Sequence, residues 1–237
     1  MKENSPQILA KAEAILEPLS KFFMEPQYNF IAAAEFPDDI KGMKWTNFNI
    51  LHFLNNPVIE PGFEGNITIP VDNAILLYNE CVNTIKKPNE DILVIGKSIC
   101  MRYIIHIVGD IHQPLHTATL FSKKFPDGDM GGNLFEITYP KKKSIKELHQ
   151  FWDATAHKYS ASIKVPITDH YYDELQEIAA SIGEKYNRST LRTELKNKTF
   201  KSWTEESGKL AFEIAYDSLN LHSGDTITDE YEEMAQD

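Results

Sequence analysis

The sequence predicts a protein that is almost entirely helical, with its 237 residues in one domain. Long stretches repeat apolar residues every three or four positions, which is the rhythm of amphipathic helices. Only Leu134–Tyr139 resembles a short strand or hairpin, and it follows a turn-forming stretch, Phe125–Asn133, that is rich in Gly, Pro and Asp. The chain is long enough for one substantial core and short for two independent ones. We therefore expect residues 1–237 to form a single all-α domain.

Three helices are expected in the first half of the chain. Ile8–Phe23 and Asp72–Ile85 each place apolar side chains on one face, and Pro88 stops the second of them. Glu90–Val108 is apolar on most of its sides. A helix that is hydrophobic nearly all round is typical of the centre of a bundle, so we expect this helix there.

Three further helices are expected in the second half. Ser144 should begin a helix that runs to about His157, and Glu147 three residues later would complete a capping box. Apolar periodicity predicts the other two helices near Asp169–Tyr186 and Phe200–Leu219. No internal repeat or linker interrupts the pattern, which favours one domain.

The charge of the chain limits how it could handle phosphates. Its formal net charge is −11, whereas proteins that hold nucleic acid non-specifically do so with many Lys and Arg side chains. Phosphate chemistry in so acidic a chain would therefore need bound divalent cations. No stretch approaches the roughly 18 to 20 uninterrupted apolar residues of a membrane span. The first residues, Met1–Pro6, show no apolar core of a signal peptide.

Two cysteines and three tripeptides bear on the compartment of the protein. Cys81 and Cys100 do not form a CxxC pair, which excludes a structural zinc site made of thiolates. One disulfide between them and two buried free thiols are both open interpretations. Asn66, Asn187 and Asn197 each begin a glycosylation acceptor tripeptide, which favours a secretory route only weakly because such tripeptides are common.

Five residues could supply metal ligands by their spacing alone. His106 and Asp110, at the end of the strongly apolar helix, are four residues apart, as are His149 and Asp153. This spacing brings two side chains to the same face of a helix, so both can reach one ion. His116 follows a Gly and a Pro that should turn the chain back toward the first pair. Imidazole and carboxylate ligands suit zinc, although ordinary surface pairs at this spacing are equally plausible on the spacing alone.

Two other histidines have weaker claims to a metal. We expect His112 to make hydrogen bonds around the ligands and His157 to face solvent near a helix end.

Three motifs, in this order along the chain, resemble those of a known family. They are Gly-Asp-Ile-His-Gln-Pro-Leu-His at 109–116, Gly-Asp-Met-Gly-Gly-Asn at 128–133 and Leu-His-Gln-Phe-Trp-Asp at 148–153. Together with His106, they resemble the class I single-strand nucleases, the zinc-dependent S1/P1 family, which shares its fold with bacterial zinc phospholipase C. The resemblance extends from about residue 8 to about residue 235, and it implies a multi-helix, all-α fold.

The resemblance also implies two further ligands and their grouping. Phe36-Pro37-Asp38 resembles the family's Trp-Ala-Asp segment, and Leu51-His52-Phe53 resembles its Leu-His-aromatic segment. One zinc would then be held by Asp38, His52, His106 and Asp110. The second zinc would be held by His116, His149 and Asp153.

A third zinc in the family is bridged by the residue that matches Asp110 and completed by an N-terminal Trp and a nearby His. Here no Trp precedes Trp45 and no His precedes His52. We therefore expect either a chain truncated at both ends, with an incomplete third zinc site, or a divergent two-zinc protein.

The resemblance implies an endonuclease that hydrolyses single-stranded DNA and RNA to 5′-nucleotides, with 3′-nucleotidase activity. Asp38 would orient a zinc-bound water, and the second zinc would stabilise the leaving 3′-oxygen. Asn133 would bind phosphate, Phe53 would stack on a base, and Asn55 would lie beside that base. Without the resemblance, Phe53 would be interpreted as a core residue and Asn133 as a turn residue.

Two other functions remain open from the sequence. A zinc phospholipase C is the rival with the same fold, although Asp rather than Glu at position 153 favours the nuclease. A truncated, inactive metal-binding helical protein is the rival of another class. For the nuclease, we expect a monomer whose partner is single-stranded nucleic acid, in an extracellular or lysosome-like compartment.

Overall fold

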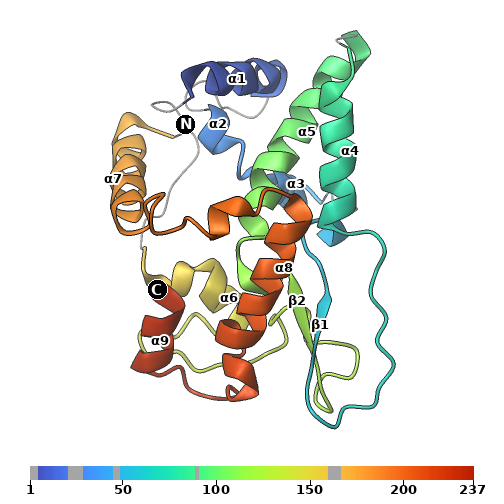
Figure 1. Ribbon diagram of the computed structural model, residues 1–237, viewed down its shortest axis with the longest axis vertical. Helices are drawn as coiled ribbons and strands as arrows, with labels where there is room; N and C mark the ends of the chain where they lie inside the picture. Colours follow the sequence, from blue (N-terminus) through green and yellow to red (C-terminus); the bar gives the residue numbers. More distant parts are fainter. Residues whose placement is uncertain (1–4, 21–28, 45–48, 89–90, 160–166) are drawn as a thin grey trace. The chain divides into compact units, whose positions relative to one another are not determined.

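The computed structural model describes residues 5–20, 29–44, 49–88, 91–159 and 167–237, and it is mostly helical (Figure 1). The all-α fold class is thus confirmed. The chain falls into two compact units, each assembled from three separate stretches. Unit 1 comprises Met1–Asn49, Ile75–Gly109 and Ala161–Lys198, and unit 2 comprises Ile50–Ala74, Asp110–Ser160 and Thr199–Asp237. Whether residues 1–237 behave as one domain stays a prediction.

Unit 1 is built from helices that the apolar periodicity largely predicts. They are α1 (Pro6–Ser20), α2 (Asn29–Ala32), α3 (Phe36–Gly42), α4 (Ala74–Lys86), α5 (Asp91–Asp110), α7 (Asp169–Lys185) and the 3₁₀ turn η4 (Glu194–Lys196), with Ala74 and Asp110 themselves counted in unit 2. The helix predicted over Ile8–Phe23 ends in the structure at Ser20, and residues 21–23 lie outside the described part. Glu90, where the next prediction began, also lies outside it. Gly109 continues α5 instead of breaking it.

The core of unit 1 lies along the second half of α5. Arg102 is fully buried there; its Nη1 donates to Ser98 Oγ at 2.7 Å and to the Leu16 carbonyl of α1 at 3.2 Å. The guanidinium also lies 5.5 Å from the centre of the Phe36 ring. Near its start, α5 leaves Val94 36% and Ile95 44% exposed. The prediction of a helix buried on most sides therefore fails for that part.

The two cysteines face one another between α4 and α5, which lie side by side (Figure 1). Both are free thiols, and Cys81 is buried. A hydrogen bond between the thiols raises the pKa of Cys81 and lowers that of Cys100. Of the two open interpretations, the structure shows the free thiols and no disulfide between them.

Unit 2 surrounds a two-stranded parallel sheet. β1 (Asn56–Ile59) pairs with β2 (Ala118–Phe121) in the register Asn56↔Ala118 (Figure 1). Every residue of β2 is buried. Around the sheet lie η1 (Asn49–Leu51), η2 (Pro114–His116), α6 (Leu148–Asp153), η3 (Thr155–His157), α8 (Phe200–Leu210), the π-helical turn η5 (Ala211–Ala215), η6 (Asp217–Leu219) and α9 (Asp229–Gln236).

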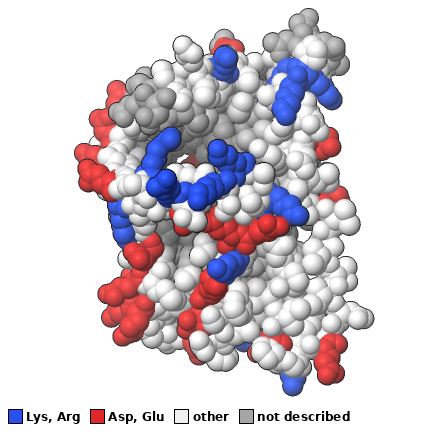
Figure 2. Space-filling view, in the orientation of Figure 1, with Lys and Arg blue, Asp and Glu red and all other residues white. Residues whose placement is uncertain are grey.

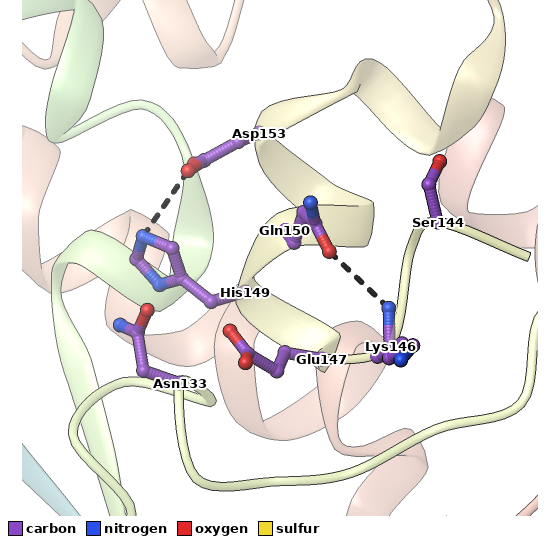
Figure 3. A pocket seen from close by; sticks show the side chains of 7 residues that line it. All are labelled: Asn133, Ser144, Lys146, Glu147, His149, Gln150 and Asp153. Atoms are coloured by element: carbon purple, nitrogen blue, oxygen red, sulfur yellow. Dashed lines mark hydrogen bonds and ion pairs between the residues drawn. The ribbon is translucent and has the colours of Figure 1, made fainter.

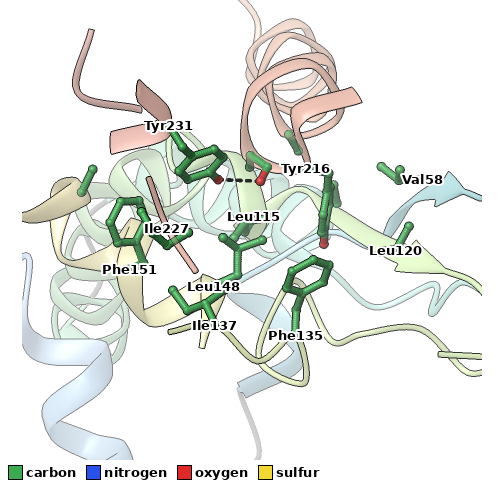
Figure 4. Close-up of a cluster of buried hydrophobic side chains, with 14 of the residues drawn as sticks. Val58, Leu115, Leu120, Phe135, Ile137, Leu148, Phe151, Tyr216, Ile227 and Tyr231 are labelled. Carbon is green, nitrogen blue, oxygen red and sulfur yellow. Dashed lines mark hydrogen bonds between the residues drawn. The ribbon is translucent and has the colours of Figure 1, made fainter. Parts of the chain in front are cut away.

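The core of unit 2 joins residues that are far apart in the sequence. Leu115 of η2, Leu148 of α6 and Phe135 of the intervening loop are each at most 1% exposed and lie together in one cluster (Figure 4). Tyr231 of α9 closes the cluster, and its hydroxyl donates to the Ala215 carbonyl. This packing fixes the backbone on both sides of the segments that carry His116 and His149.

The strand predicted at Leu134–Tyr139 is wrong in its extent. Glu136 forms an isolated antiparallel bridge with Glu147, and Thr138 forms a parallel one with Thr226. Because successive residues bond to different segments, no continuous ladder develops. The strands that do pair, β1 and β2, precede the glycine-rich turn.

The helix predicted from Ser144 is also shorter than expected, and its capping box is absent. The Lys146 carbonyl accepts a hydrogen bond from Ile137 N at 2.8 Å, and Glu147 is extended with φ −128°. These contacts hold residues before Leu148 out of a helix, so α6 has six residues. Similarly, the helix predicted over Phe200–Leu219 keeps α-helical hydrogen bonding only to Leu210.

Acidic side chains gather over α9 on the face shown in Figure 2. Its first turn carries Asp229, Glu230 and Glu232. Lys141 offsets part of this charge, with Nζ 2.8 Å from Asp229 and 2.9 Å from Glu232. Of the helices the structure describes, none has both the length and the apolar character needed to cross a membrane.

Candidate metal centre

Unit 2 brings His116, His149 and Asp153 together, as the motifs predict. His116 Nε2 lies 3.3 Å from Asp153 Oδ1, and His149 Nε2 lies 3.3 Å from Asp153 Oδ2. The candidate ligand atoms of the three residues all lie within 4.8 Å of one another. We refer to these three residues as the triad.

Two short helical elements position the triad. α6 presents His149 and Asp153 one turn apart on one face. η2 presents His116, and its start is capped by Gln113, whose Oε1 accepts from Leu115 N at 2.5 Å. The same side chain donates through Nε2 to Asp153 Oδ1 at 2.8 Å. Gln113 thus fixes the η2 turn and one ligand carboxylate at once.

The orientation of His149 is set by a backbone carbonyl of the glycine-rich turn. Its Nδ1 lies 2.7 Å from the Gly131 oxygen. A carbonyl can only accept, so Nδ1 must carry the proton, and Nε2 of the neutral ring keeps its lone pair toward Asp153. Gly131 has φ +62°, and a Cβ there would lie 2.5 Å from the Leu115 carbonyl oxygen. Only glycine fits this position without a shift of backbone.

A buried carboxylate holds that turn in place. Asp129 is fully buried and accepts from Leu120 N at 2.9 Å and from the Tyr216 hydroxyl at 2.8 Å. The backbone N–H groups of Gly131 and Gly132 also donate to it. Burial raises the pKa of Asp129, and these hydrogen bonds counteract the rise only in part. Sequence reasoning missed Asp129; an acid between the glycines of a turn was the only signal.

The charges within the triad are coupled. Burial disfavours the imidazolium of His116, but the hydrogen bond to Asp153 and the nearby Asp110 and Asp153 carboxylates outweigh it and raise the His116 pKa. Burial raises the pKa of Asp153, but its contacts with His116, His149 and Gln113 lower the pKa by more, so the net shift is downward. A cation bound among these groups would supply the positive charge that the proton on His116 otherwise provides.

Asp110 and His52 extend the triad within unit 2. Asp110 Oδ2 lies 3.3 Å from His52 Nδ1 and 3.8 Å from His116 Nδ1. The His52 side chain is 4% exposed and that of Asp110 is 14% exposed. The carboxylate therefore lies between two imidazoles, which is the environment expected of a metal ligand.

Asp38 and His106 form a second pair, in unit 1. His106 Nε2 lies 3.9 Å from Asp38 Oδ1, and its Nδ1 is 2.6 Å from the Ala34 carbonyl, which again leaves Nε2 with the lone pair. Asp38 is 59% exposed in its side chain and pairs with Lys41 Nζ at 2.5 Å. Of the four ligands predicted for the first zinc, His52 and Asp110 lie together in unit 2, and Asp38 and His106 lie together in unit 1. That all four bind one ion stays a prediction.

The triad fits a zinc ion by the chemistry of its donors. It offers two imidazoles and one carboxylate, which is the usual ligand number of a catalytic zinc that keeps one open position. The His149 ring is held by a carbonyl and Asp153 by an amide, as second-layer groups hold zinc ligands elsewhere. Asp153 is 49% exposed in its side chain, so this edge is accessible to a substrate.

The three predicted substrate contacts have different surroundings. Asn133 is exposed and lines a cavity together with His149 and Asp153 (Figure 3); its Nδ2 donates to the Met130 carbonyl at 2.8 Å. Asn55 accepts a hydrogen bond from Thr119 at 2.9 Å. Phe53 is half-buried next to His52. Of the three, only Asn133 is placed beside the triad.

The structure corrects the expectation for His157, whereas the hydrogen bonds expected of His112 stay a prediction. His157 is half-buried, and its ring is 6.2 Å from that of Tyr139, so the prediction that it faces solvent is wrong. His157 lies in the separate turn η3, because α6 ends at Asp153. His112 is exposed, with its ring 5.7 Å from that of Trp203 of α8.

Comparison with known proteins identifies the chain's relatives. The family model described as S1/P1 Nuclease matches residues 5–237. Endonuclease 3 of Arabidopsis thaliana is 28% identical over 127 residues, covering 52% of this chain and 40% of that protein. Endonuclease 1 of the same plant is 24% identical over 225 residues, covering 84% and 66%. Nuclease S1 of Aspergillus oryzae is 32% identical over 78 residues, covering 32% and 24%. The match with Endonuclease 3 thus spans two fifths of that relative's length.

Proposed function

The chain belongs to the S1/P1 nuclease family, and from this premise we propose that it is a zinc-dependent endonuclease. Its substrates are single-stranded DNA and RNA, which it cuts to 5′-nucleotides. The observation that carries the proposal is the triad, in which His149 is fixed by the Gly131 carbonyl at 2.7 Å with Nε2 toward Asp153. A cation at this point would balance the Asp153 carboxylate and be bound by the two imidazoles gathered around it.

The residues divide between two zinc ions in this proposal. The triad holds one, and Asp38, His52, His106 and Asp110 hold the other, as the family resemblance implies. Zinc in such a site polarises phosphoryl oxygens and lowers the pKa of water toward 7. Because these two sets of ligands account for two ions, we propose that the chain binds two zinc ions.

The remaining side chains bind and orient the substrate. Asp38 accepts a hydrogen bond from the attacking water, for which its exposed carboxylate is suited. Asn133 keeps one amide N–H free of its bond to Met130 and directs it to a phosphate oxygen. Phe53 stacks on an unpaired base, which selects single strands because paired bases hide their faces. Asn55 lies at the edge of that base.

Cleavage assays with the zinc-loaded protein test the proposal. Labelled single-stranded DNA, single-stranded RNA and a duplex of the same sequence serve as substrates, and mass spectrometry identifies the ends. We expect the single strands to be cut, 5′-phosphates to appear, and a chelator to stop the reaction until zinc is added. Hydrolysis of phosphatidylcholine without cleavage of single strands would instead assign the phospholipase chemistry.

A pair of histidine variants links the activity to the triad. His149→Ala removes one ligand, so zinc binding and cleavage should both fall by at least 100-fold. His170→Ala removes an exposed histidine of α7 that contacts Glu174 at 3.5 Å and the ring of Tyr171 at 5.7 Å, and it should behave like the wild type. Equal activity of the two variants would show that the triad is not the site.

We also propose 3′-nucleotidase activity at the same centre. Release of phosphate from a 3′-mononucleotide, and none from the 5′-isomer, is the expected result. Loss of this activity in His149→Ala should parallel the loss of strand cleavage.

A secretory or lysosome-like compartment and a monomeric state are further parts of the proposal. Asn66, Asn187 and Asn197, the three acceptor asparagines, are all exposed, as glycosylation requires. A mass decrease after glycosidase treatment of protein from a eukaryotic host is expected. Light scattering should give the mass of one chain.

A further inference from the structure

A polar cavity opens beside the triad and extends away from it within unit 2. Its volume is about 470 Å³, which lies within the usual range for small-ligand sites and suits about one nucleotide unit. Asn133, His149 and Asp153 line one end, and Ser144, Lys146 and Gln150 line the other (Figure 3). The first group belongs to the site described above, whereas the second group has no role in it.

The chemistry of the far end favours sugar and phosphate groups. Ser144 offers a hydroxyl, Gln150 a carboxamide and Lys146 an ammonium, while Glu147 between the two ends offers an acceptor. Among the described residues that line the cavity there is no Phe, Tyr, Trp or aliphatic side chain, and the ring of His149 belongs to the triad at the other end. A base therefore has no surface to stack on here, in contrast to the usual platforms for single strands.

Lys146 is held in place but keeps its charge available. Its backbone N donates to Gln150 Oε1 at 3.2 Å, and its carbonyl accepts from Ile137 N at 2.8 Å, so its Cα is fixed on the cavity wall. No ion pair joins its ammonium to a residue of the described part. Lys141, in the same loop, is by contrast bonded to Asp229 and Glu232. In a chain of net charge −11, a lysine available beside the metal ligands is a distinct feature.

We propose that this cavity is a subsite for the sugar–phosphate backbone of the strand next to the bond that is cut. Lys146 contacts the phosphate adjacent to the scissile one, and Ser144 and Gln150 bind the sugar between them. The subsite rests on the proposed nuclease function and adds to it a dependence on substrate length. It reads the backbone alone, so it contributes affinity without base preference.

Lys146→Ala tests the subsite, with Lys143→Ala as the matched control. Lys143 is an exposed lysine of the same loop that does not line the cavity. For the zinc-loaded enzyme, Lys146→Ala should raise KM for a trinucleotide and longer strands about five- to tenfold. It should leave KM for a 3′-mononucleotide unchanged, because that substrate has no adjacent phosphate. Lys143→Ala should resemble the wild type with every substrate.

A binding measurement gives a readout that does not depend on turnover. Fluorescence anisotropy of a labelled, hydrolysis-resistant phosphorothioate strand is followed against salt concentration. One lost phosphate contact should reduce the slope of log affinity against log salt by about 0.7 in Lys146→Ala and leave it unchanged in Lys143→Ala. Replacing the adjacent phosphate by a neutral methylphosphonate should weaken binding to the wild type but not to Lys146→Ala.

The outcomes separate the two claims. If the two lysine variants behave alike, or the methylphosphonate weakens both proteins equally, the subsite is wrong while cleavage by the wild type still supports the nuclease. If the zinc-loaded wild type neither binds nor cuts single strands, the proposed function fails and the subsite fails with it.

Discussion

At the scale of single residues, the geometry of the triad depends on groups outside the proposed ligand set. Asp129 holds the glycine-rich turn, the turn places the Gly131 carbonyl, and that carbonyl holds the His149 ring. Gln113 does the same for Asp153. Motifs could identify His149 and Asp153 from the sequence, because ligand type and spacing are visible there. The supporting contacts could not be identified, since they join residues whose proximity only the fold creates.

Asp129→Ala should destabilise the protein and weaken the triad. It leaves the buried Leu120 N–H and Tyr216 hydroxyl without their acceptor, at about 1–3 kcal/mol each. Urea unfolding of the zinc-free protein measures the stability, and competition with a chromophoric chelator measures zinc affinity, which should fall about tenfold. Ser122→Ala removes another buried acceptor, that of Phe125 N, three residues before the first glycine of the turn; it should cost about 1 kcal/mol and leave zinc affinity unchanged. Equal zinc affinity in both variants would argue against the role of Asp129.

The raised pKa of Asp129 predicts a pH dependence of stability. A carboxyl whose folded-state pKa exceeds its ordinary value, 3.8, contributes stability that is complete below that value. The contribution is lost as the pH rises through the folded-state pKa. The free energy of unfolding of the wild type, relative to Asp129→Asn, should therefore decrease as the pH rises above 3.8 and level off above the folded-state pKa. A relative stability that increases with pH would mean that the hydrogen bonds, and not burial, dominate.

Gln113→Ala should loosen the metal site with little effect on the fold. The substitution removes the amide that donates to Asp153 Oδ1 and the cap of the three-residue turn η2. We expect zinc affinity at the triad to fall about tenfold, as for other supporting groups. Gln176→Ala, at an exposed position of α7, is a control that should leave both affinity and stability unchanged. An unaltered affinity in Gln113→Ala would show that η2 and Asp153 hold their positions without it.

At the scale of elements, the apolar rhythm predicted where helices lie but not where short ones begin. α4, α5 and α7 match their predicted spans closely because long periodic stretches dominate local competition. Ser144 failed as a helix start because residues before Leu148 are engaged by the loop at Glu136 and Ile137. A pairing partner eight or more residues away leaves no signal in a capping motif.

The glycine-rich turn offers a test at this scale. In Gly131→Ala, the new Cβ would meet the Leu115 carbonyl oxygen at 2.5 Å and face φ +62°. In Gly224→Ala, only the backbone strain at φ +107° should reduce stability, because nothing lies within 4 Å of the new Cβ. Thermal unfolding should show a loss of about 1–2 kcal/mol for Gly224→Ala and more for Gly131→Ala. Only Gly131→Ala should also weaken zinc binding. Equally weakened zinc binding in Gly224→Ala would contradict the role of Gly131 in positioning His149.

At the scale of the whole molecule, the charge implies that the proposed nucleic-acid binding depends on the proposed metal. The net charge of −11, with acidic side chains over α9 (Figure 2), disfavours the approach of a phosphate backbone. The sequence predicted this balance and the ligand types, because both depend on composition and spacing. The sequence did not indicate the division into two discontinuous units, because contacts between stretches far apart in the chain leave no local pattern.

Removal of zinc should therefore abolish binding as well as cleavage. With chelator present, the anisotropy of a labelled single strand should indicate an affinity at least tenfold lower than with zinc. Readdition of zinc should restore it. Equal affinity with and without zinc would mean that Lys and Arg side chains alone hold the strand, contrary to the electrostatic argument.

The zinc content of the purified protein tests the central claim most directly. Elemental analysis after dialysis, with chelator-treated protein as the blank, should give two equivalents of zinc per chain. His149→Ala should lose one equivalent and His170→Ala none. A content near zero in the wild type, or an unchanged content in His149→Ala, would contradict the assignment of His116, His149 and Asp153 as a zinc site.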